Sequence, residues 1–97
     1  MEKYKVILST KVRSQLLEHV SFLSRVSLPA ARRLRNSFDE VKERLKDNPF
    51  QFPIDPTFEN LQLNYRNALF EGRYKALFTI EGNTVFNSVV CNLLLSQ

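Results

Sequence analysis

The sequence has little of several residue types that particular protein classes require. Its 97 residues include one cysteine, one histidine, two glycines and no tryptophan. A single cysteine cannot form an internal disulfide, and Cys91 with His19 cannot make up a zinc-ligand set, so we expect no metal site. Two glycines are too few for the glycine-rich loops that hold nucleotide phosphates. We therefore expect no cofactor of the ATP, GTP or NAD kind.

Long hydrophobic runs are absent as well. No run of apolar residues is longer than three, whereas a membrane-spanning helix needs about 20. Met1-Glu2-Lys3 leads directly into a strand-like pattern, without the apolar core of a signal peptide. These features predict a cytoplasmic protein with no membrane partner.

The overall composition is that of an ordinary folded protein. Hydrophobic residues make up 43% of the sequence and charged residues 25%, close to the averages for soluble globular domains. A chain of this length has room for one small core. We therefore expect a single domain over residues 1–97.

Positive charge is concentrated in the first third of the chain, although the formal net charge is only +4. Between Lys3 and Arg35 there are eight basic residues and one acidic residue, whereas residues 36–63 carry three basic and six acidic residues. A basic surface of this kind could bind RNA, DNA or an acidic protein segment, or it could be a solvated helix face. Charge alone does not choose between these roles.

The first half of the chain has the pattern of a strand followed by two helices. Residues 4–8 are short, β-branched and alternating, which predicts a strand. Ser9-Thr10 is a helix N-cap sequence, and Ser27-Leu28-Pro29 ends that helix and begins another. Apolar residues recur every three or four positions along both helices, at Val12, Leu16, Val20, Leu23 and Val26 and then at Ala31, Leu34, Phe38, Val41 and Leu45. We expect these helices to form an antiparallel hairpin.

The second half has the pattern of an irregular loop followed by three strands. Asn48-Pro49 ends the second helix, and further prolines keep the next stretch irregular. Its aromatic residues are expected to be buried: Phe50, Phe52 and Phe58. Strands are expected at residues 65–70, 73–81 and 84 to about 92, joined by tight turns. Alternation in the middle strand places Tyr74, Ala76, Phe78 and Ile80 on one face and Arg73, Lys75, Leu77, Thr79 and Glu81 on the other.

This order predicts an α+β fold, in which a strand and a two-helix antiparallel hairpin precede a three-stranded antiparallel meander, with the hairpin packed on one face of the sheet. His19 lies beside the apolar stripe of the first helix and is expected to face the second helix. Cys91 is expected to be a small buried hydrophobe.

Several short segments, taken in order and with their spacing, carry a family resemblance. They are Tyr4-Lys5-Val6-Ile7-Leu8-Ser9, Pro49 with Phe52-Pro53, Tyr65-Arg66, Gly72-Arg73-Tyr74-Lys75-Ala76-Leu77-Phe78, and Asn83-Thr84-Val85-Phe86. Over nearly its whole length the chain resembles the RelE/ParE superfamily of bacterial type II toxins. The resemblance implies a compact toxin whose basic surface is bound and silenced by a cognate antitoxin protein.

The resemblance also implies one of two toxic actions, which are ribosome-dependent cleavage of messenger RNA and poisoning of DNA gyrase. RNA-cleaving members use Lys and Arg side chains of the sheet together with an Arg, Tyr or His near the C-terminus. In this chain the catalytic positions of the sheet correspond to Arg66 and Lys75. Residues 84–97, however, contain no Lys, Arg, His, Tyr, Asp or Glu. We therefore expect action by target binding rather than by RNA cleavage.

Five further residues are candidates for contacts with nucleic acid or the antitoxin. Arg73 and Tyr74 belong to the matching segment of the middle strand, and Arg32, Arg33 and Arg35 form a basic cluster on the second helix. Each has a simpler alternative role, as a solvated side chain or, for Tyr74, as an amphipathic core residue. The leucines at 93–95 are expected to be covered by the antitoxin or by a second copy of the chain in a homodimer.

Three functions therefore stay open at the level of sequence. The first, which we prefer, is a toxin that binds its target, as a gyrase poison does. The second is a messenger-RNA endonuclease that uses Lys75, Arg66 and Arg73 to stabilise the phosphate. The third is an inactive relative that keeps only antitoxin binding.

Overall fold

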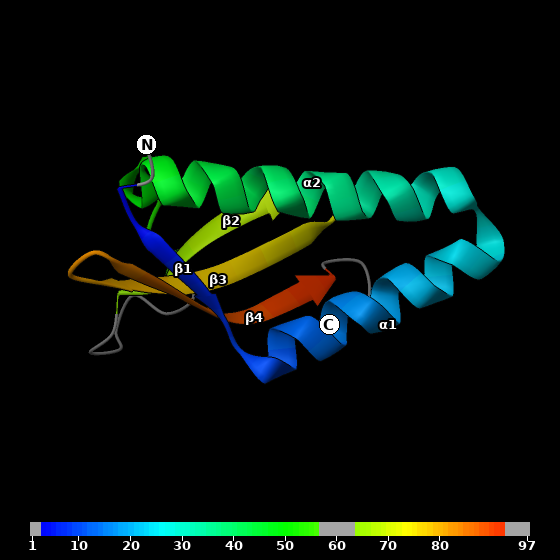
Figure 1. Cartoon of the computed structure of the whole chain (residues 1–97), viewed down its shortest axis with the longest axis horizontal. Coiled ribbons are helices and arrows are strands. Elements are labelled where there is room, and N and C mark those ends of the chain that lie inside the picture. Colours follow the sequence, from blue (N-terminus) through cyan, green and yellow to red (C-terminus); the bar gives the residue numbers. More distant parts are fainter. Residues whose placement is uncertain (1–2, 57–63, 93–97) are drawn as a thin grey trace.

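The computed structural model of the chain describes residues 3–56 and 64–92. It contains one four-stranded sheet with two helices packed against it (Figure 1). The elements are β1 (Lys5–Leu8), α1 (Thr10–Val26), α2 (Leu28–Asp47), a short 3-10 helix η1 (Pro49–Gln51), β2 (Arg66–Phe70), β3 (Tyr74–Glu81) and β4 (Thr84–Asn92). The predicted α+β order of a strand, two helices and three strands is confirmed.

Both helices begin at a serine cap, as the sequence predicts. The Ser9 hydroxyl accepts a hydrogen bond from the Val12 backbone N–H at 3.1 Å, and the Ser27 hydroxyl accepts one from the Ala30 N–H at 3.3 Å. Each serine satisfies one of the N–H groups that have no partner within the first helical turn. Pro29 stands in the first turn of α2, where a missing N–H costs nothing.

The sheet is mixed, with the strand order β1-β4-β3-β2. Strands β2, β3 and β4 form the predicted antiparallel meander. The first strand joins this meander in parallel with β4, and Lys5 lies opposite Thr84. The turn between β2 and β3 passes through Glu71 and Gly72, at φ angles of 52° and 71°, a left-handed conformation that glycine adopts without strain.

The core lies between the helices and one face of the sheet, and Phe78 is one of its fully buried residues. All five predicted apolar positions of α2 are buried. On α1 only Val12 is fully buried, and Val26 is 71% exposed, so the predicted end of its apolar stripe is wrong. The reason is visible in Figure 1, where the last turns of α1 extend beyond the end of the sheet.

The loop after α2 buries one of its phenylalanines and exposes another. Phe52 is buried, and its ring meets the ring of Phe78 at a centroid distance of 5.7 Å. Phe50 is 53% exposed, contrary to expectation, because it lies over the Arg66 guanidinium at the margin of the core. Phe58, like the leucines at 93–95, lies outside the described residues.

Candidate functional site

Lys75, one of the two candidate catalytic residues, is held in an internal ion pair. Its Nζ lies 2.8 Å from Oδ2 of Asp55, a carboxylate that is only 1% exposed, and the Lys75 side chain is itself 21% exposed. The same carboxylate oxygen accepts a hydrogen bond from the Asn67 Nδ2 at 3.0 Å. A buried carboxylate requires partners of this kind. The charge of Lys75 is therefore already balanced within the chain.

Arg66, the second candidate, lies at the start of β2 and is also engaged by the chain. Its Nη1 donates a 2.6 Å hydrogen bond to the backbone oxygen of Phe52, and its guanidinium lies 5.1 Å from the centre of the Phe50 ring. Arg66 lies opposite Phe78 in the ladder, whereas Lys75 lies opposite Leu69. Directly opposed residues share a face, and successive residues of a strand point to opposite faces. The two candidates therefore point to opposite faces of the sheet and do not form one site.

Tyr74 is part of the core rather than of the surface. It is 3% exposed, stacks on Phe70 at 5.5 Å and meets the His19 ring edge-on at 5.3 Å. Burial raises the pKa of Tyr74 above its ordinary value, an effect that nearby Arg73 reduces. The sequence predicts that His19 faces α2, and its ring contacts Tyr74 on the helix-covered face of the sheet. Arg73 is exposed in the turn before β3 and is not part of the strand.

All three arginines of the basic cluster on α2 are exposed: Arg32, Arg33 and Arg35. These three arginines do not act as a unit. The Arg33 Nε pairs with the Glu71 carboxylate at 3.3 Å, and Ser37 donates to the same carboxylate at 2.8 Å, so Arg33 helps to tie the β2–β3 turn to the helix. Arg35 instead lines a groove on another side of α2.

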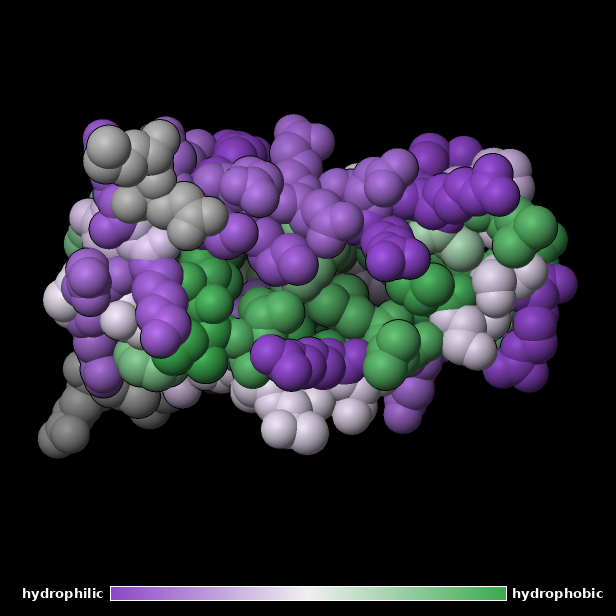
Figure 2. All heavy atoms as spheres, in the orientation of Figure 1, coloured by the Kyte–Doolittle hydropathy of each residue, from purple (hydrophilic) through white to green (hydrophobic). Residues whose placement is uncertain are grey.

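This groove, of about 440 Å³, lies between α1 and α2 next to the end of β1. Its apolar lining consists of Leu8, Leu16, Leu17, Val20 and Phe38, and its charged lining consists of Arg13, Arg35, Lys42 and Asp39. Figure 2 shows apolar side chains gathered in a band between the polar side chains of the two helices. We call this feature the hairpin groove.

The hairpin groove combines solvent-exposed apolar surface with an excess of positive charge. Leu17 is 71% exposed, although its side chain is fully apolar. The lining carries three cations and one anion, and the anion, Asp39, is paired with Lys42 at 3.4 Å. Arg13 and Arg35 are the remaining charges. An apolar floor with a cationic rim suits an apolar segment that carries acidic side chains.

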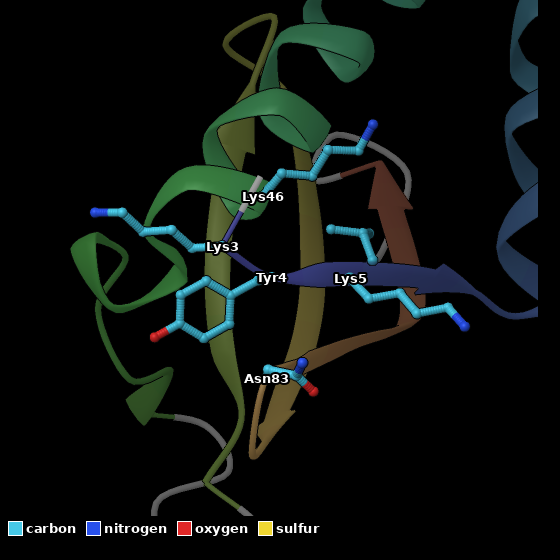
Figure 3. A pocket seen from close by; sticks show the side chains of 6 residues that line it. Lys3, Tyr4, Lys5, Lys46 and Asn83 are labelled. Atoms are coloured by element: carbon cyan, nitrogen blue, oxygen red, sulfur yellow. The ribbon is translucent and has the colours of Figure 1, made fainter. Parts of the chain in front are cut away.

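A second pocket, of about 310 Å³, lies beside β1 and is lined by three lysines among other residues. Figure 3 shows Lys3, Lys5 and Lys46 with their ammonium groups directed away from one another. The Lys46 Nζ also lies 3.5 Å from a Glu43 carboxylate oxygen. In this arrangement the three ammonium groups do not converge, so the pocket presents no single anion-binding site.

Two other kinds of site receive no support from the described part of the chain. Within residues 3–56 and 64–92, no three side chains of His, Cys, Asp or Glu are grouped so that they could hold a metal ion. Neither of the helices described there is long and apolar enough to cross a membrane.

Sequence reasoning missed two residues of these arrangements. Asp55 lies in an irregular loop, 20 positions before the lysine that it binds, and nothing in its neighbourhood signals a partner. Arg13 belongs to the predicted basic stretch, but its place in the same groove lining as Arg35 depends on how the two helices pack.

No family model matches the sequence, and neither does any of the curated proteins.

Proposed function

We propose that this chain is the toxin component of a type II toxin–antitoxin pair, that it acts by binding its target, and that an acidic antitoxin segment silences it by occupying the hairpin groove. The main support for this proposal is the hairpin groove, because it is an exposed apolar surface with a cationic rim. The order of the elements is that expected of a RelE/ParE-like toxin.

The chemistry of the hairpin groove selects the kind of partner. An amphipathic helix whose apolar side chains recur every three or four residues could place them against Leu16, Leu17 and Val20. Acidic residues beside that stripe would meet Arg13 and Arg35. A second copy of the chain is a poorer occupant, because it would bring the same two arginines against each other.

The environment of Lys75 supports binding over RNA cleavage. A lysine that stabilises a phosphate must have a charge to offer it. Here that charge is balanced by Asp55 at 2.8 Å, and Arg66 lies on the other face of the sheet. An endonuclease of the kind implied by the resemblance would have to rearrange both contacts before it could act.

The proposal can be tested by expressing the chain in a bacterial host, alone and together with the product of any short reading frame beside its gene that encodes an acidic protein. We expect the chain alone to arrest growth and the acidic protein to restore it. Leu17→Glu places a carboxylate in the hairpin groove and should prevent the acidic protein from binding the chain, and with it this rescue; co-purification of the two proteins measures the loss of binding whether or not the variant still arrests growth.

The chain offers a matched control on the same helix. Phe22 is also apolar and 62% exposed, but it does not line the groove, so Phe22→Glu should still be rescued. Equal rescue of both variants would refute docking in the groove. Normal growth without the acidic protein would refute toxicity.

A further inference from the structure

The outer edge of β2 is partly covered by the chain itself. β2 is the last strand of the sheet, and residues Pro53–Asp55 run antiparallel to it, with Ile54 bridged to Arg66. The Asp55 N–H donates to the Tyr65 oxygen at 2.8 Å, and the Asn67 N–H donates to the Pro53 oxygen at 3.0 Å. We call Pro53–Asp55 the strap.

The strap ends the sheet instead of extending it. Successive residues of a strand direct their backbone groups to opposite sides, so only Ile54 of the strap presents its N–H and C=O outward. Prolines at 53 and 56 have no N–H to donate. A further strand would therefore find almost no hydrogen-bonding groups on the outside of the strap. Covering an edge in this way is a known protection against association through open strands.

The Asp55 side chain is what fastens the strap to the sheet. Its buried carboxylate accepts from Asn67 on β2 at 3.0 Å and pairs with Lys75 on β3 at 2.8 Å, so it reaches across two strands. Both contacts lie on the face of the sheet opposite the helices. Strand alternation also places Leu77 on this outer face, and Leu77 is buried there.

We infer that the strap keeps β2 from pairing with β2 of a second copy of this chain, and that the Asp55 carboxylate holds the strap in place. Two antiparallel copies of one strand form a symmetric pair, in which each residue makes the same contact twice. In a pair centred on Asn67, the charged Arg66 of one copy would lie opposite Ala68 of the other rather than opposite itself. Leu69, which is 60% exposed, would add apolar contact.

The test is the dimer dissociation constant, measured by sedimentation over a range of protein concentrations. Asp55→Asn keeps the size of the side chain but removes the charge that holds Lys75, and we expect it to lower the constant by about tenfold or more relative to the unchanged chain. Glu43→Gln is the control, because it likewise neutralises a carboxylate, in a surface ion pair with Lys46 on α2 that lies outside the hairpin groove. It should leave the constant unchanged.

A second substitution shows whether the new contact uses β2. Leu69→Lys places a charge beside the uncovered edge, and a lysine there opposes pairing of strands. Combined with Asp55→Asn, it should restore the original constant. If Asp55→Asn does not fold, as judged by circular dichroism, Lys75→Met removes the other half of the ion pair and should strengthen dimerisation in the same way. An unchanged constant in the folded variant, or association that Leu69→Lys does not reverse, would overturn the inference.

Discussion

The buried amide of Asn87 provides a sharp test of the packing described above. Asn87 lies on β4 opposite Phe78 and is 1% exposed, and neither Nδ2 nor Oδ1 of its side chain has a hydrogen-bond partner among the described residues. A buried polar group without a partner costs about 1–3 kcal/mol. The Asn87 backbone oxygen, by contrast, accepts a bond from the Ser9 N–H at 3.1 Å that any residue at this position would keep.

Asn87→Val should therefore stabilise the protein. The change removes both unpaired polar atoms and introduces a residue that suits a strand. Its added bulk offsets part of the gain in a packed core. We expect the free energy of unfolding to rise by about 2 kcal/mol, which raises the melting temperature by about 10 °C in a domain of this size. Chemical denaturation followed by circular dichroism measures the change.

The matched control is Asn67→Val on β2, because the Asn67 amide does have a partner. It donates to the Asp55 carboxylate at 3.0 Å, so its loss should lower the free energy of unfolding by about 1–2 kcal/mol. The two substitutions should thus have opposite signs. A loss of stability in Asn87→Val as large as that in Asn67→Val would show instead that the Asn87 amide is hydrogen-bonded, for example to a buried water.

Two further predictions concern the β2–β3 turn and the residue that follows it. Gly72→Ala should cost about 1 kcal/mol of stability, because alanine is strained at a φ of 71°; no heavy atom lies within 4 Å of the added methyl group, so thermal unfolding should report this backbone cost alone. The raised pKa of Tyr74, caused first by its burial, means that the folded chain keeps the phenolic proton more tightly than the unfolded chain does. The contribution of Tyr74 to stability should therefore be fully present below the ordinary pKa of 10.0 and should be lost as the pH rises through the pKa of the folded chain. Unfolding measured across this pH range should show a smaller loss of stability in Tyr74→Phe.

Local signals predicted the elements well. The cap residues Ser9 and Ser27 mark the beginnings of both helices, and the five apolar positions of α2 are all buried. Glycine-containing turns separate the three strands of the meander at the expected places. These features depend on residues within a few positions of one another, and the sequence displays them directly.

Contacts between residues that are distant in the sequence could not be predicted from such local signals. The parallel contact between β1 and β4 joins Lys5 to Thr84, and no periodicity indicates which strand of the meander receives β1. The sequence suggests a phosphate contact for Lys75, because nothing in it connects this lysine with Asp55. The exposure of Val26 depends on the length of α1 relative to the sheet. In each case the decisive neighbour is distant in the sequence.

Induced expression of the chain alone in a bacterial host, with protein synthesis and DNA synthesis pulse-labelled separately, distinguishes action by target binding from action by RNA cleavage. A toxin that acts by binding a target such as DNA gyrase should first block DNA synthesis and leave chromosome breaks, with messenger RNA intact. An early fall in protein synthesis accompanied by cut messenger RNA would instead show that the chain cleaves RNA, although Lys75 is paired with Asp55 and Arg66 is bonded to Phe52.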